Sequence, residues 1–154
     1  MQALGMESGT ISDSQITASS EWSEINSPKR ARLYTKEDPY GRGAWSSLTN
    51  DLNQWLQVDL GKITPVTHVA TQGRNSYSPL QMVTKYKVQF SDDGASFLFY
   101  KRQGESSDAV NRKKYFKTFF QDIFVTVFSR LRLQFFTIRA HPKPANNFFS
   151  SLSL

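Results

Sequence analysis

Aromatic and aliphatic side chains stand among polar neighbours in a first loop, residues 21–28. Trp22 and Ile25 lie there between strand-like segments and belong to no obvious apolar periodicity. An exposed tryptophan offers a large contact area and keeps an N–H donor, so it can stack on a sugar face or lie at a membrane interface. The alternative is that Trp22 folds back onto the core, because tryptophan is often largely buried.

Two further loops combine apolar tips with arginine: a second loop, residues 36–45, and a third loop, residues 73–80. The candidate ligand-binding residues of all three loops are Trp22, Ile25, Tyr40, Arg42, Arg74, Tyr77 and Leu80. A guanidinium can pair with an anion or a carboxylate, and apolar tips can cover the apolar part of a ligand. For the third loop, the alternative is a plain solvated loop.

The residues for metal, cofactor and catalytic chemistry are scarce. The chain has no cysteine and two histidines, which leaves little material for a metal site. Gly41-Arg42-Gly43 lacks the third glycine and the strand–helix context of a dinucleotide loop. Ser91-Asp92-Asp93-Gly94 has too few carboxylates for a calcium loop and is typical of a hairpin turn. Because no Ser/His/Asp constellation or paired carboxylates stand out either, we expect no enzyme activity, no metal and no cofactor.

The basic excess lies in one part of the chain. Residues 1–100 hold nine basic and ten acidic side chains, whereas residues 101–154 hold ten basic and three acidic ones. Cations mixed with aromatic residues can fit nucleic acid or anionic lipid. Apolar residues interrupt these cations rather than leaving them clustered, so we expect no nucleic-acid partner.

Strands must position these loops. Residues 55–60 alternate, with Leu56, Val58 and Leu60 on one face, and Gly61-Lys62 then predicts a tight turn before a second strand over residues 63–71. Residues 85–90 alternate again and lead through a turn into residues 97–100, which predicts a hairpin. With no sustained 3.6-residue apolar period in this region, the prediction is an all-β sandwich.

Length and composition fit one domain that spans residues 1–154. The 154 residues are 38% hydrophobic and 14% aromatic, which is enough for a buried core and disfavours disorder. The longest apolar stretches are too short to cross a membrane as a helix. The first residues form neither a basic nor a continuous apolar segment, so they predict no signal peptide.

Several segments, in order and with fitting spacing, resemble the discoidin domain, also called the factor V/VIII type C domain. They are residues 4–9, 11–20, 31–33, 43–45, 54–61, 69–74 and 86–94. The resemblance covers residues 3–100. It implies an eight-stranded jelly-roll β-sandwich of the galactose-binding-like class, with Trp45 in its core.

The resemblance also implies a function. Discoidin domains are extracellular modules of secreted or membrane-anchored parents, and loops at one end of the barrel bind a glycan, an anionic phospholipid or a matrix protein. We therefore expect a non-enzymatic adhesion module with a cell-surface or matrix partner, and with peripheral membrane contact where the ligand is a lipid. The third loop matches the position of a ligand-binding loop in this family.

Residues 101–154 depart from the family pattern. The family's terminal cysteine pair and its closing Arg-x-Glu-Leu-x-Gly-Cys strand are absent. Leu131, Leu133 and Phe135 alternate with polar residues and permit a strand. The segment is either a diverged half of the sandwich or non-native sequence that replaces the final strands. In the second case the chain would be an incomplete fragment of a larger adhesion protein, with no binding activity of its own.

Overall fold

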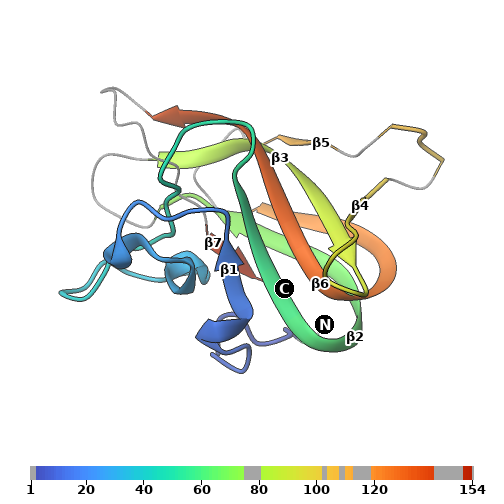
Figure 1. The fold of residues 1–154 in the computed structure, drawn as a ribbon, viewed down its shortest axis with the longest axis horizontal. Coiled ribbons are helices and arrows are strands. Elements are labelled where there is room, and N and C mark those ends of the chain that lie inside the picture. The colour runs from blue at the N-terminus through green and yellow to red at the C-terminus, as the bar shows by residue number, and fades with distance from the viewer. Residues whose placement is uncertain are drawn as a thin grey trace.

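Two layers of antiparallel strands form the molecule (Figure 1). The computed structural model describes residues 3–74, 81–101, 104–107, 110–112, 119–140 and 151–153. Its elements are η1 (Asp13–Gln15), β1 (Ile16–Ala18), η2 (Glu24–Asn26), η3 (Pro28–Ala31), β2 (Trp55–Gln72), β3 (Gln81–Ser91), β4 (Leu98–Phe99), β5 (Val110–Arg112), β6 (Phe119–Ala140) and β7 (Ser151–Ser153). Within the described residues, no helix is long and apolar enough to cross a membrane.

The strand order is β1-β2-β6-β3-β4, with β5 beside β3 and β7 beside β2. The long strands β2 and β6 each turn back on themselves, so each belongs to both layers (Figure 1). The first half of β2 pairs with β6 from Trp55↔Gln134 to Asp59↔Arg130, and the second half from Thr64↔Phe128 to Thr71↔Phe119. The described residues form seven strands, so the expected count of eight is not confirmed.

The bend of β2 lies at Gly61, where the sequence predicts a turn. Gly61 has a φ of 73°, which glycine adopts without strain, and its N–H donates to Asp59 Oδ1 at 2.8 Å. The prediction of two separate strands is wrong in one respect, because β2 continues through the bend as a single strand with an irregular register. Ile63 lies exposed at this bend.

The core lies between the two layers and follows the predicted alternation. Leu56, Val58, Tyr86 and Val88 are buried, as the period of two residues predicts, and Trp45 is fully buried among them. Val66 packs into the same core from the second half of β2. Each buried aliphatic side chain contributes about 1.5–3 kcal/mol by removing apolar area from water.

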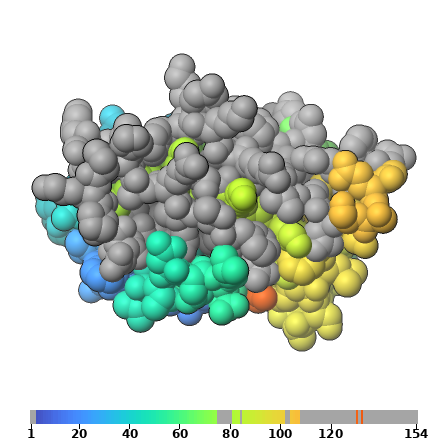
Figure 2. All heavy atoms as spheres, turned by 90° about the horizontal axis from the view of Figure 1, so that it is seen from above, coloured from blue at the N-terminus to red at the C-terminus, as the bar shows by residue number. Residues whose placement is uncertain are grey.

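The hairpin and the late strand are confirmed. Phe90 pairs with Leu98 across the predicted turn, and β6 includes the alternating residues 131–135. β6 lies between β2 and β3 and makes most of the long-range pairing of the sheet. Figure 2 shows a small patch of β6 (orange) at the surface between the segment that leads into β2 (teal) and the β3–β4 segment (yellow).

Candidate ligand-binding loops

The first two loops and the start of the third lie at the same end of the sandwich. The first and second loops fall between the end of β1 and the start of β2, where Ser19 N donates to Trp55 O at 3.0 Å. The third loop begins where β2 ends, and there Tyr34 N donates to Gln72 Oε1 at 3.2 Å. Because β2 bends, its last residues return to the end of the sandwich where the strand begins, which brings Arg74 of the third loop near Glu37 of the second (Figure 1).

The first loop holds its apolar tips in solvent while its backbone is hydrogen-bonded to the second loop and to Ser46, the residue that follows it. Trp22 is 50% exposed and Ile25 is 42% exposed. Trp22 N donates to Ser46 O at 2.8 Å, and Arg42 N donates to Ile25 O at 2.7 Å. The hypothesis that Trp22 folds back onto the core is therefore wrong. Trp45 is the buried indole, and its Nε1 donates to Ser20 O at 3.0 Å.

The Arg30 side chain holds the second loop through several hydrogen bonds, a role that the sequence did not indicate. Its Nε donates to Arg42 O at 2.7 Å, its Nη1 to Asp38 Oδ2 at 3.0 Å, and its Nη2 to the Lys36 and Gly41 carbonyls at 2.7 and 3.1 Å. A Cβ at Gly41 would lie 2.8 Å from Arg30 Nε, so glycine permits this close approach. No local pattern identifies such a residue, because its partners are 6 to 12 residues away.

Asp38 shapes the tip of the second loop. The hydrogen bond from Arg30 lowers the pKa of Asp38 below its ordinary value, with further help from the backbone N–H groups of Tyr40 and Gly41. Asp38 Oδ1 accepts from Tyr40 N at 2.9 Å, and Asp38 and Gly41 exchange backbone hydrogen bonds. This tight turn leaves Tyr40 87% exposed.

Arg42 and Arg74 meet at one carboxylate, which the sequence analysis also missed. Arg42 Nη1 donates to Glu37 Oε1, and Arg74 Nη2 donates to Glu37 Oε2 at 3.3 Å. The Arg42 side chain is 44% exposed, whereas that of Arg74 is 9% exposed. Burial, and then the charge of Arg42, lower the pKa of Arg74. Arg74, predicted as a partner for an anion or a carboxylate, is thus a largely buried cation.

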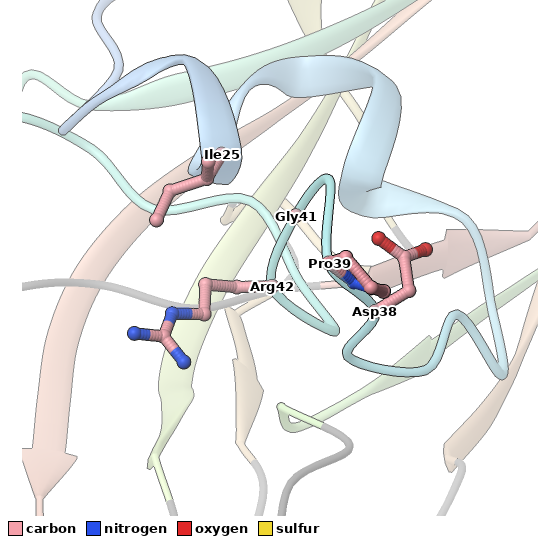
Figure 3. A pocket seen from close by; sticks show the side chains of 5 residues that line it. All are labelled: Ile25, Asp38, Pro39, Gly41 and Arg42. Atoms are coloured by element: carbon pink, nitrogen blue, oxygen red, sulfur yellow. The ribbon is translucent and has the colours of Figure 1, made fainter.

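A hollow of about 220 Å³ opens between the first and second loops. Its lining consists of Ile25, Asp38, Pro39, Gly41 and Arg42. Figure 3 shows Ile25 and Arg42 projecting toward the same side from two different segments, with the Asp38 carboxylate turned away from them. This volume is below the 300–1,000 Å³ of pockets for drug-sized ligands, so the hollow suits one small group, such as a single ring.

The predicted contacts Tyr77 and Leu80 lie outside the described residues. The other five candidates, Trp22, Ile25, Tyr40, Arg42 and Arg74, are brought to one end of the sandwich. In the part of the chain that the structure describes, no cluster of three histidine or acidic side chains is arranged to hold a metal ion.

Comparisons with known proteins identify the family. The F5/8 type C domain model matches residues 15–134. Coagulation factor V of Sus scrofa is 39% identical over 138 residues, which is 83% of this chain and 6% of that protein. The chain therefore corresponds to a small part of this relative.

Solved structures show the same fold. Discoidin II of Dictyostelium discoideum superposes with a TM-score of 0.75 at 16% identity, over 90% of this chain and 53% of that chain. A CBM32 module of Clostridium perfringens, in complex with GalNAc-beta-1,3-galactose, gives 0.68 at 15% identity, over 99% of this chain and 98% of that chain. The predicted jelly-roll β-sandwich of the discoidin and galactose-binding-like class is confirmed. The chain belongs to the F5/8 type C, or discoidin, family.

Proposed function

We propose that this chain is a non-enzymatic, extracellular module that binds a glycan through its first and second loops. The observation that carries the proposal is the exposed Trp22 ring in the same short loop as Ile25, which lines the hollow with Arg42. An aromatic ring stacks on the apolar face of a sugar, while polar groups around it bond to the hydroxyls.

The charges around Trp22 favour a ligand with many hydroxyl groups over an anionic surface. Glu21 and Glu24 flank Trp22, and both are exposed. Carboxylates accept hydrogen bonds from sugar hydroxyls, whereas they repel a layer of anionic headgroups. Arg42 at the rim supplies donors to the same ligand. The similarity of the fold to that of a carbohydrate-binding module also supports a sugar as the ligand.

A second candidate is an anionic phospholipid surface. The exposed Ile25 and Tyr40 are the observation in its favour, because aliphatic and aromatic tips can enter the boundary between headgroups and acyl chains. A cation beside them would add attraction to anionic lipid. This candidate predicts binding that falls steeply as salt is raised, whereas binding of a neutral sugar is insensitive to salt.

The test compares glycans and lipid vesicles on the purified chain. Titration calorimetry against galactose, N-acetylgalactosamine and chitotriose measures the first candidate, and cosedimentation with phosphatidylserine vesicles measures the second. Trp22→Ala should weaken glycan binding at least tenfold, because it removes the stacking surface. Ile63→Ala, an exposed apolar residue at the bend of β2, is the matched control and should bind as the wild type does.

The binding results distinguish the two candidate ligands. Binding to glycans that is lost in Trp22→Ala supports the proposal, and binding to vesicles alone that is lost in Tyr40→Ala supports the second candidate. A folded chain that binds neither would overturn both. A chain without a cooperative thermal transition would favour the incomplete fragment instead.

A further inference from the structure

A fourth loop, residues 46–53, connects the second loop to β2 and carries an exposed apolar side chain. Leu48 is 52% exposed, close to the 50% of Trp22. The backbone N of Leu48 donates to Ser20 Oγ at 3.0 Å, and Ser20 lies two positions before Trp22. Leu48 is thus an exposed apolar side chain whose backbone is bonded to the chain that leads into the first loop.

The position of Leu48 relative to the hollow follows from the hydrogen bonds that join the two chain segments. Arg42 N, at the hollow, donates to Ile25 O at 2.7 Å. Farther along, Trp22 N donates to Ser46 O at 2.8 Å, and the bond from Leu48 comes last. The order along this antiparallel pairing is therefore the hollow, then Trp22, then Leu48. A ligand longer than one ring, with its first ring at the hollow, can reach Leu48 past Trp22.

The buried side chain of Gln54 fixes the fourth loop in place. Its Oε1 accepts from the hydroxyls of Ser19 and Ser20 at 2.7 and 2.6 Å. Its Nε2 donates to Thr49 Oγ1 at 2.9 Å and to Asp51 Oδ1 at 3.0 Å. Both the oxygen and the nitrogen of the amide therefore make all the hydrogen bonds that they can make. A loop that is ordered in this way before binding loses little conformational entropy when a ligand binds to it.

The chain segments around the two apolar side chains are polar and acidic. No lysine or arginine occurs in residues 1–28 or 43–61. Glu21 and Asp51, which lie within these segments, are exposed, and their charges repel an anionic lipid surface. Asn50 is also exposed, and its amide can donate to hydroxyl groups and accept from them. An aliphatic side chain among such groups favours a sugar ring, which has an apolar face and hydroxyls at its edge.

We propose that Leu48 forms a second sugar subsite next to Trp22, so that the chain binds a glycan of more than one unit. The first ring lies at the hollow and stacks on Trp22, and the next ring packs its apolar face on Leu48. This inference rests on the proposed function for the sugar at Trp22. It adds that the ligand is an oligosaccharide, and that the fourth loop selects it over a single sugar.

The test compares single sugars with longer glycans. Galactose is paired with lactose, and N-acetylglucosamine with its β-1,4-linked trimer, in calorimetric titrations of the wild type and Leu48→Ser. Leu48→Ser should weaken the binding of the longer glycans about threefold to tenfold, because it removes the apolar area that the second ring covers. Its affinity for the single sugars should stay that of the wild type, since these reach only the hollow and Trp22.

The matched control is Leu98→Ser, the same substitution at an exposed leucine of β4 that lies outside the four loops. It should bind every glycan as the wild type does. Leu48→Met keeps an apolar side chain of similar size and should restore the affinity for the longer glycans. Thermal unfolding shows that each variant is folded.

The outcomes separate this inference from the proposed function. Glycan binding that is lost in Trp22→Ala but unchanged in Leu48→Ser would overturn the second subsite and leave the proposed function standing. Equal weakening of single sugars and longer glycans in Leu48→Ser would also overturn it. A wild type that binds none of these sugars would overturn both proposals. If Leu48→Ser instead loses binding to phosphatidylserine vesicles, Leu48 contacts lipid and the sugar subsite is wrong.

Discussion

The central carbon of the Arg132 guanidinium, on β6, lies 3.7 Å from the centre of the Phe97 ring and 4.3 Å from the centre of the Trp55 ring. Its Nε and Nη2 donate to Gln57 Oε1 at 3.2 and 2.8 Å. One arginine thus connects the start of β2, the segment before β4, and β6 on the outer face of one layer.

Replacement of Arg132 by lysine should lower the free energy of unfolding by about 1 kcal/mol. Lysine keeps the charge but loses the flat guanidinium that stacks on the rings and the paired bonds to Gln57. Urea denaturation measures the change. Arg42→Lys is the control, because the 44% exposed Arg42 side chain makes an ion pair with Glu37 that lysine can replace. Equal stability of Arg132→Lys and wild type would show that the stack contributes nothing.

Arg30→Gln should release the second loop. Four hydrogen bonds to that loop would be lost from a side chain that is 14% exposed, and we expect a loss of about 2 kcal/mol in stability. Hydrogen exchange should speed up at the amides of Gly41 and Arg42. Arg32→Gln is the matched control, since Arg32 bonds Met6 O and Asp13 instead and its loss should leave the exchange of these two amides unchanged.

Trp45→Phe should destabilise the fold by about 2–3 kcal/mol. The smaller ring leaves a void at a fully buried position, and the carbonyl of Ser20 loses its indole donor. Chemical denaturation gives the size of the loss. The half-exposed Trp22 provides the comparison, because Trp22→Phe should change stability by less than about 0.5 kcal/mol. Similar losses in the two variants would contradict the assignment of Trp45 as the core indole.

Asp93 should make stability depend on pH in the acid range. Its carboxylate accepts from the Ser96 and Ala95 N–H groups, each at 2.8 Å, and from the Ser91 hydroxyl at 2.9 Å, which lowers the pKa of Asp93 to about 2. Because the folded state has the lower pKa, the stabilisation is present above the unfolded value near 4. It is lost as pH falls toward 2.

Asp93→Asn should therefore be less stable than the wild type at pH 7, and the difference should shrink between pH 4 and pH 2. Thermal unfolding at a series of pH values measures it. A difference between Asp93→Asn and wild type that stays constant across this range would show that the carboxylate does not hold the β3–β4 turn.

Local sequence pattern determined much of the fold. The alternation of Leu56 with Val58 and of Tyr86 with Val88 identified the buried faces, because side chains alternate across a strand whatever lies beyond it. The turn residues after Ser91 identified the hairpin, because turn formation also depends on residues that are neighbours in the sequence. Polar neighbours and turn residues suggested exposure of Trp22 and Tyr40, but for Trp22 the sequence left burial open, and the structure shows that it is half exposed.

Only the tertiary structure decided how the loops are held and where their charges meet. Glu37 pairs with Arg74 across 37 positions of sequence, and the bend of β2 at Gly61 is what brings the third loop back beside the second. Arg30 and Glu37 carry no periodicity that marks them, because an ion pair depends on distance through space and not on spacing along the chain. The sequence therefore predicted Trp22 and Tyr40 as candidate contacts, and the folded chain showed that both are exposed and that Arg30 and Asp38 hold the turn that carries Tyr40.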